Sequence, residues 1–139
     1  MKKIVYLNGK YINFKFAKIS IEDRGFQFSD GVYEVIALKN YKFIDLNFHL
    51  FRLKKSLREL DIKYRFKNND IIKIFKKLIG VNNFKNGLIY IQITRGVQER
   101  SHVYLNNLKP TIIIYTLIKK FNDNPNKIKC VSAITYPDL

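Results

Sequence analysis

The stretch "EDRGFQFSDGVYEV", residues 22–35, decides the fold class that we predict, because in it a polar, glycine-containing segment leads directly into a strand. Over residues 31–38 the side chains alternate in character, which is typical of a half-buried strand. One face carries Val32, Glu34, Ile36 and Leu38, and the other carries Tyr33, Val35 and Ala37. Gly31 has no side chain, so we expect another backbone segment to lie close to it.

The segments on either side also carry strand and turn signals. Two short apolar runs flank Asn8-Gly9, the dipeptide best suited to a two-residue hairpin turn. A second hairpin is expected to turn at residues 39–41. Further apolar strands are predicted at residues 87–94, 111–118 and 127–136, joined by long polar loops.

The middle of the chain has helical periodicity. Leucines recur at alternating steps of four and three, at Leu46, Leu50, Leu53, Leu57 and Leu60. Asn47 is predicted to be the N-cap of this helix. A second helix is predicted from about Asp70 to Gly80, with an inward face made of Ile71, Ile74, Phe75, Leu78 and Ile79. The order of strands, two helices and strands favours a single α+β domain with a mainly antiparallel sheet.

Length and composition limit the class of protein. A chain of 139 residues that is 47% hydrophobic can bury the core of one domain. No apolar run approaches the ~20 residues that span a bilayer. The start "MKKIVYLNGK" is too short for the core of a signal peptide, so we expect a cytoplasmic protein without a membrane partner. The single cysteine, Cys130, excludes an intramolecular disulfide.

The net charge of +15 raises the question of a nucleic-acid partner. The lysines are scattered along a chain that is rich in Lys, Ile and Asn throughout, and no long basic tract or nucleic-acid motif is present. This distribution favours a compositional origin of the charge. A non-catalytic, nucleic-acid-binding module remains the alternative from another functional class.

Glu34 and Tyr33 are the notable side chains of the 31–38 strand. A carboxylate on an otherwise apolar face needs a cationic partner when it is buried, and we expect Arg24 or Arg95 to supply it in a structural pair. A tyrosine in a strand is most often part of the core or of the sheet surface. The residues alone therefore give Tyr33 no function.

Two pairs of basic residues could bind an anion. His49 and Arg52 lie three apart at the start of the leucine-rich helix, where phosphate binds well, although a solvated basic surface gives the same pattern. Arg100 and His102 lie two apart after the strand 87–94, so in an extended segment both point the same way. A guanidinium and an imidazole aimed together suit a small carboxylate, whereas a mobile charged loop is the structural alternative.

Several other chemistries lack their residues. The sequence has no glycine-rich phosphate loop and no strand–turn–helix serine motif. With two histidines and one cysteine, we expect neither a metal site nor a Cys/His nucleophile pair.

Five segments, in order and at suitable spacing, resemble the N-terminal half of D-amino-acid aminotransferases, which are fold-type IV (class IV) pyridoxal-phosphate enzymes. They are "LNGKYI", "SIEDRGFQFSDGVYEVI", "HLFRLKKSLREL", "IYIQITRGVQERSH" and "KPTIIIYT". The resemblance covers nearly the whole chain. The Arg-x-His pair after "TRG" favours this group over branched-chain aminotransferases and aminodeoxychorismate lyase, which stay as alternatives.

The resemblance implies a role for each candidate residue. Tyr33 would line the pocket and help to hold the substrate carboxylate. Arg100 and His102 would complete this carboxylate site in the other subunit of a homodimer. Arg52 would bind the phosphate of pyridoxal 5'-phosphate. The implied reaction converts D-alanine and 2-oxoglutarate to pyruvate and D-glutamate, with the cofactor ring as electron sink.

The resemblance also implies that the chain is incomplete. In the family the Schiff-base lysine ends an Arg-Trp-x-Arg-Cys-Asp-Ile-Lys stretch, and this sequence stops a few residues before it. We therefore expect residues 1–139 to form the small N-terminal domain, with the C-terminal cofactor-binding domain absent. Such a chain would be catalytically inactive alone and would bind the cofactor weakly.

Overall fold

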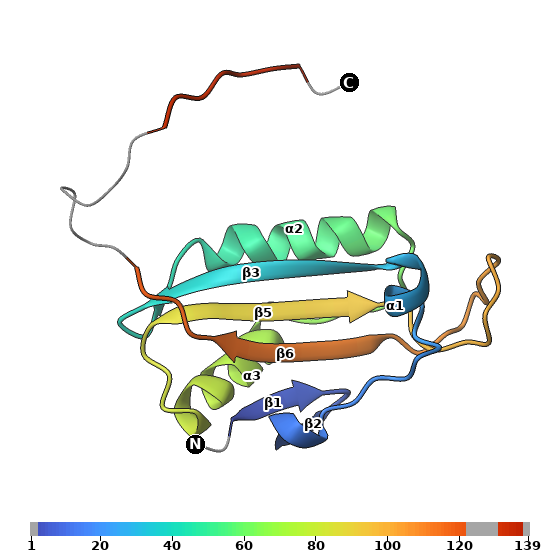
Figure 1. The fold of residues 1–139 in the computed structure, drawn as a ribbon, viewed down its shortest axis with the longest axis horizontal. Helices are drawn as coiled ribbons and strands as arrows, with labels where there is room; N and C mark the ends of the chain where they lie inside the picture. Colours follow the sequence, from blue (N-terminus) through green and yellow to red (C-terminus); the bar gives the residue numbers. More distant parts are fainter. Residues whose placement is uncertain (1–2, 122–130, 138–139) are drawn as a thin grey trace.

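The structure, a computed structural model, describes residues 3–121 and 131–137. The elements run in the order β1 (Ile4–Leu7), β2 (Lys10–Asn13), the 3-10 helix η1 (Phe14–Phe16), α1 (Arg24–Phe28), β3 (Gly31–Lys39), β4 (Lys42–Phe43), α2 (Leu46–Glu59), α3 (Asn68–Val81), β5 (Gly87–Thr94) and β6 (Thr111–Leu117) (Figure 1). The predicted order of strands, two long helices and strands is confirmed. The short helix α1 was not predicted.

The described strands form one sheet in the order β2-β1-β6-β5-β3-β4, and each neighbouring pair is antiparallel. The strand β3 pairs with β5 over most of its length, from Gly31 opposite Thr94 to Leu38 opposite Gly87. A Cβ atom added to Gly31 would lie 2.9 Å from the Ile93 carbonyl oxygen, which confirms the expected close approach of another backbone. The α+β class with an antiparallel sheet is therefore confirmed.

The first hairpin turns as predicted. Leu7 pairs with Lys10, and the two residues between them, Asn8 and Gly9, have φ angles of 47° and 90°. Asn8 also ties the turn to the sheet, because its side-chain Oδ1 accepts from the Ile112 amide at 2.8 Å. The second hairpin, with Asn40 and Tyr41 at positive φ, joins β3 to β4 at the predicted place.

The core lies between one face of the sheet and the two long helices (Figure 1). Three of the five leucines in the predicted stripe, Leu50, Leu53 and Leu57, are buried against it, whereas Leu60 is 43% exposed because α2 ends at Glu59. The strand β3 contributes the face that carries Val32, Glu34, Ile36 and Leu38, with Ile36 and Leu38 fully buried. The apolar faces of the helices and of the strand therefore pack against each other in one core.

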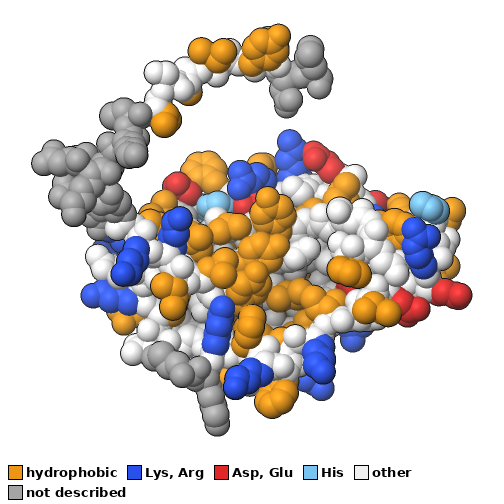
Figure 2. Space-filling model, in the orientation of Figure 1, with side chains coloured by type: hydrophobic (Ala, Val, Ile, Leu, Met, Phe, Trp, Pro, Cys, Tyr) orange, Lys and Arg blue, Asp and Glu red, His pale blue; other side chains and the backbone are white. Residues whose placement is uncertain are grey.

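Among the described residues no long helix covers the other face of the sheet, and Figure 2 shows hydrophobic side chains gathered across its middle. Three tyrosines form a row there: the Tyr33 and Tyr90 rings stack at 5.8 Å, and the Tyr90 and Tyr115 rings lie 5.0 Å apart. The segment after β2 adds Phe14, Ile19 and Ile21, which are exposed and lie beside the sheet residues Gln92 and Ile113. The open face therefore exposes apolar and aromatic side chains to solvent, unlike the face that packs against α2 and α3.

The helix ends differ from the prediction. Asp45, not Asn47, is the N-cap of α2, since the chain turns out of the β3–β4 hairpin through Asp45 at φ 52°. Gly80 does not end α3, because the helix continues to Val81 and the left-handed residue beyond it is Asn83. Within the part of the chain that the structure describes, no helix is both long and apolar enough to cross a membrane.

The predicted strand at residues 127–136 is wrong for the part that can be compared. Residues 131–137 are exposed and have no regular structure, while residues 127–130 lie outside the described residues. In the sheet order, β5 and β1 occupy both sides of β6, so a following strand could pair only at an outer edge, beside β2 or β4. An apolar alternation in sequence cannot show that the edge is taken.

The buried side of α2 gives the first testable prediction. Replacing the fully buried Leu53 with alanine should lower the free energy of unfolding by about 2–5 kcal/mol, because it leaves a cavity between α2 and the sheet. Phe51→Ala, on the exposed side of the same helix, should change it by less than about 0.5 kcal/mol. Urea denaturation of both variants tests this, and equal losses would contradict the burial assignment.

Candidate functional site

The short helix α1 places the first residues of the site. Asp23 is its N-cap, since the carboxylate Oδ1 accepts from the Gly25 amide at 2.8 Å. Ser29, at φ 56°, ends the helix after five residues. Arg24 and Phe28 stand at opposite ends of this one helix. The sequence does contain a signal for α1, which is an aspartate at the capping position before Arg-Gly. An analysis of strand alternation does not detect this signal.

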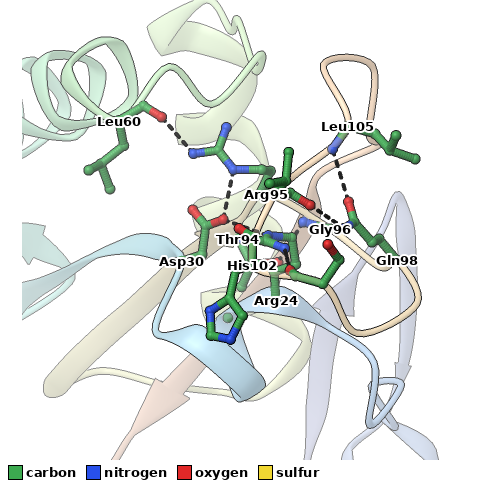
Figure 3. A network of polar contacts seen from close by, with 12 residues as sticks. Arg24, Asp30, Leu60, Thr94, Arg95, Gly96, Gln98, His102 and Leu105 are labelled. Atoms are coloured by element: carbon green, nitrogen blue, oxygen red, sulfur yellow. Dashed lines mark hydrogen bonds and ion pairs between the residues drawn. The ribbon is translucent and has the colours of Figure 1, made fainter.

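A largely buried carboxylate joins α1 to the end of β5. Asp30 Oδ2 accepts from Arg24 Nε at 2.8 Å and from Arg95 Nε at 2.7 Å (Figure 3). Burial of the carboxyl raises its pKa, but the hydrogen bonds and charges of Arg95 and Arg24 outweigh that effect, so the pKa of Asp30 is lowered. Asp30, not Glu34, is therefore the partner of both arginines. The prediction for Glu34 is corrected on this point.

The remaining guanidinium nitrogens of Arg24 and Arg95 bind backbone carbonyls. Arg95 donates from Nη2 to Leu60 at 2.7 Å and from Nη1 to Asp61 at 3.0 Å, just beyond the end of α2. Arg24 donates from Nη1 to Ser101 at 2.6 Å and from Nη2 to His102 at 3.3 Å. The segment between β5 and β6, which we name the 95–110 loop, is thus fixed to α1 through Arg24.

The 95–110 loop is also held by its own residues (Figure 3). Gln98 donates from Nε2 to the Val103 carbonyl at 2.8 Å and accepts from the Leu105 amide at 3.0 Å. Gly96 has φ 115°, and any Cβ there would overlap the Lys109 carbonyl where the two ends of the loop meet. Only glycine fits this position. The loop therefore has a defined closure at its base.

Arg100 and His102 come together on one aromatic ring. The Arg100 Cζ atom lies 5.3 Å from the centre of the Phe28 ring, and the His102 ring centre lies 5.4 Å from it. Both side chains are exposed, so their polar groups remain open to solvent. The structure thus places both predicted carboxylate ligands in contact with the Phe28 ring. Phe28, which sequence analysis did not single out, is their common contact.

Glu34 binds the other pair of basic residues. Arg52 donates from Nε to Oε1 and from Nη2 to Oε2, both at 2.6 Å, and His49 Nδ1 donates to Oε2 at 2.7 Å. Arg52 reaches Glu34 from the second turn of α2, which lies beside β3. Arg24 at the start of α1 and Arg95 just after β5 bind Asp30 instead. His49 and Arg52 are therefore not simply a solvated basic surface. They share one buried carboxylate.

The charges in this second group are paired. Burial raises the pKa of Glu34, but hydrogen bonds from Arg52 and His49 outweigh that effect, so the pKa is lowered and the carboxylate stays ionised. The hydrogen bond and charge of Glu34 in turn raise the pKa of Arg52. The Arg52 side chain is still 66% exposed. Within the described residues its Nη1 atom has no partner, so a donor remains for an external anion.

Tyr33 lies on the open face of the sheet. Its ring is 64% exposed and stacks on Tyr90 with an angle of 16° between the ring planes. Burial raises the pKa of Tyr90, and Tyr115 and Tyr33 add to this. Tyr33 also makes a small contribution to the raised pKa of Arg52, because the two side chains are near each other. The Tyr33 ring therefore stacks on the open face, while Arg52 binds Glu34 from α2.

The candidate residues form two groups. Tyr33 and Arg52 lie near β3 and α2, whereas Arg100 and His102 lie on the 95–110 loop, and no contact joins the groups in the described chain. Arg52 fits one part of a phosphate site, because its exposed guanidinium is held rigidly and keeps a free donor. Among residues 3–121 and 131–137, no cluster of three or more His, Cys, Asp or Glu could hold a metal ion.

The pairing of Glu34 gives a prediction for pH dependence. Because its folded pKa is below the ordinary 4.5, the carboxylate stabilises the fold above that pH, and this contribution is lost as pH falls through the lowered value. The unfolding free energy of Glu34→Gln should therefore fall below that of the unmodified chain at about pH 7, and the difference should shrink towards about pH 3.

Urea denaturation at the two pH values measures this effect. The control is Glu59→Gln, an exposed residue 3.6 Å from Lys55, which should change stability by less than about 0.5 kcal/mol at either pH. A difference for Glu34→Gln that does not depend on pH would contradict the ion-pair assignment.

Comparison with known proteins places this fold in a family. The family model described as amino-transferase class IV matches residues 31–138. The D-alanine aminotransferase of Staphylococcus aureus (strain MSSA476) is 38% identical over 142 aligned residues, which cover 100% of this chain and 49% of that protein. The chain spans about half the length of the curated relatives that it matches.

Solved structures agree with the fold. The branched-chain amino acid aminotransferase from Escherichia coli matches with a TM-score of 0.79 and 16% identity over 93% of this chain and 48% of that one. The 4-amino-4-deoxychorismate lyase of Pseudomonas aeruginosa matches with a TM-score of 0.65 and 23% identity over 81% and 39%. With the family match over most of the sequence, this chain belongs to the class IV aminotransferases.

Proposed function

We propose that this chain is the N-terminal small domain of a pyridoxal-phosphate-dependent D-amino-acid transaminase, which converts D-alanine and 2-oxoglutarate to pyruvate and D-glutamate. The relative from Staphylococcus aureus bears the name D-alanine aminotransferase and aligns with the whole chain. The observation that carries the proposal is the joint presentation of Arg100 and His102 on the Phe28 ring. These two side chains supply the donors that a substrate carboxylate requires.

The chemistry of carboxylate binding fits this arrangement. A guanidinium offers a planar fork of donors to a carboxylate, and an imidazole adds a third donor. The 95–110 loop projects past the end of the sheet beside α1 (Figure 1). A loop directed outward in this way can reach a neighbouring molecule, so we assign Arg100 and His102 to the active site of the other subunit of a homodimer. Tyr33, on the open face, completes the carboxylate site within its own subunit.

The cofactor belongs to the function of the class, and Arg52 is the residue of this chain that we assign to its phosphate. When bound, pyridoxal 5'-phosphate provides an electron sink for breaking the bond from the α-carbon to hydrogen. Arg52 would donate from Nη1, while Glu34 and His49 keep the guanidinium in place through the other two nitrogens and the shared carboxylate. The role of this chain is then to orient the cofactor and the substrate.

The same proposal makes the chain one part of a larger catalytic unit. Since it spans about half of its curated relatives, we propose that the catalytic lysine and the cofactor-binding domain belong to the other half. The four assigned side chains, Tyr33, Arg52, Arg100 and His102, bind and orient but transfer no proton to carbon. Residues 1–139 alone should therefore lack transaminase activity.

A transaminase assay tests this division. The 139-residue chain with pyridoxal phosphate, D-alanine and 2-oxoglutarate should form no pyruvate, because no residue assigned here can act as the catalytic lysine. Adding the C-terminal half of the Staphylococcus aureus relative should restore pyruvate formation. Pyruvate from the chain alone would refute the division, and activity of the mixture with L-leucine but not D-alanine would favour a branched-chain aminotransferase.

The carboxylate site is tested separately in the restored enzyme. Arg100→Ala should raise the KM for D-alanine by about 10- to 100-fold, the factor expected when a charge-assisted hydrogen bond is lost. Arg58→Ala removes another exposed arginine, on α2, and should leave the KM unchanged. An Arg100 variant with the KM of the unmodified enzyme would exclude the assignment.

A further inference from the structure

We infer that Phe28 is a positioning residue, whose ring sets the direction of the Arg100 and His102 side chains. Its consequence for substrate binding rests on the function proposed above, but the positioning itself is a property of this chain. Phe28 lies at the end of α1, outside the strand and the loop that carry the assigned ligands. The ion pairs of Asp30 and Glu34 do not explain why Phe28 contacts Arg100 and His102.

The geometry shows one ring with three cationic or polar neighbours. The Cζ atom of Arg24 lies 4.7 Å from the Phe28 ring centre, and that of Arg100 lies 5.3 Å from it. The His102 ring is tilted by 55° to the Phe28 ring at 5.4 Å. Distances under about 6 Å bring a guanidinium within the attractive range of an aromatic face. Phe28 is therefore the shared contact of the two loop side chains.

The backbone and the side chains of the loop have different anchors. Arg24 fixes the backbone, because it donates to the carbonyls of Ser101 and His102. These bonds leave the exposed side chains of Arg100 and His102 free to rotate. The Phe28 ring supplies the contact that limits this rotation. Anchoring of the backbone alone would leave the directions of the two side chains undetermined.

The chemistry of the group explains why an aromatic ring suits this position. Arg24 and Arg100 carry like charges, which repel each other when they lie around one point. The face of a phenylalanine ring attracts cations without contributing a charge of its own. A carboxylate at the same position would bind Arg100 and compete with an anionic substrate. Phe28 can hold both basic side chains and leave their donors available.

The test uses the full 139-residue chain, which has only two histidines, His49 and His102. NMR spectra of the histidine-labelled protein at one fixed pH should show two sets of ring signals, assigned with His102→Asn. In Phe28→Leu the His102 signals should lose their ring-current displacement, while the His49 signals stay in place and report an intact fold. Phe28→Tyr keeps the ring and should keep the displacement.

A second measurement follows Arg100. Trypsin cleavage after Arg100 should be about 2- to 5-fold faster in Phe28→Leu, the factor that corresponds to one exposed cation–π contact. Cleavage after the exposed Lys85 should not change. His102 signals and an Arg100 cleavage rate that match those of the unmodified chain would overturn the inference. Both measurements use the chain alone, so they do not depend on the outcome of the transaminase assay.

Discussion

The carboxylate of Asp30 is the contact on which the arrangement of the site depends. One oxygen accepts from Arg24 and from Arg95, and these two arginines bind the carbonyls of four further residues, at the end of α2 and in the 95–110 loop. A helix, a sheet strand and a loop thus meet at one largely buried charge. Removing one member of such a group leaves the others unpaired in the interior, which typically costs about 3–5 kcal/mol. Arg24 therefore fixes the loop to the core, in addition to the hydrogen bonds within the loop itself.

Glu34 organises the other end of the site by the same principle. Asp30 and Glu34 lie on the same short segment, one before β3 and one within it, and each has an arginine and a second basic group bound to it. Their pKa values are both lowered, because hydrogen bonds from the cations outweigh the cost of burial. The chain has a net charge of +15, and these two carboxylates bind four of its basic residues. The guanidinium groups of Arg24 and Arg95 are buried and hydrogen-bonded, whereas those of Arg52 and Arg100 are exposed to solvent.

The sequence predicted those features that depend on local periodicity. The alternation of residues 31–38 and the Asn8-Gly9 turn were correct, and the leucine stripe was correct for Leu50, Leu53 and Leu57, because each depends on neighbours within a few positions. The partner of Glu34 was not predictable in this way, since several arginines were compatible with it and only the packing of α2 beside β3 selects Arg52. Phe28 was missed because a helix of five residues has no periodic signal. The strand expected at residues 127–136 was wrong over residues 131–136, the part that can be compared, because strand pairing depends on a free edge elsewhere in the sheet.

Burial separates the supporting residues of the site from the residues assigned to ligands. The groups that hold the site, Asp30, Glu34, Arg24 and Arg95, are buried or nearly so, whereas the groups assigned to ligands, Tyr33, Arg52, Arg100 and His102, are all exposed. A binding site normally surrounds its ligand, and these exposed groups surround nothing within the described chain. The open sheet face with its row of tyrosines has the same character, since an apolar surface of this kind is usually covered. The proposal that another domain and another subunit complete the site accounts for this division, because they would cover the exposed groups.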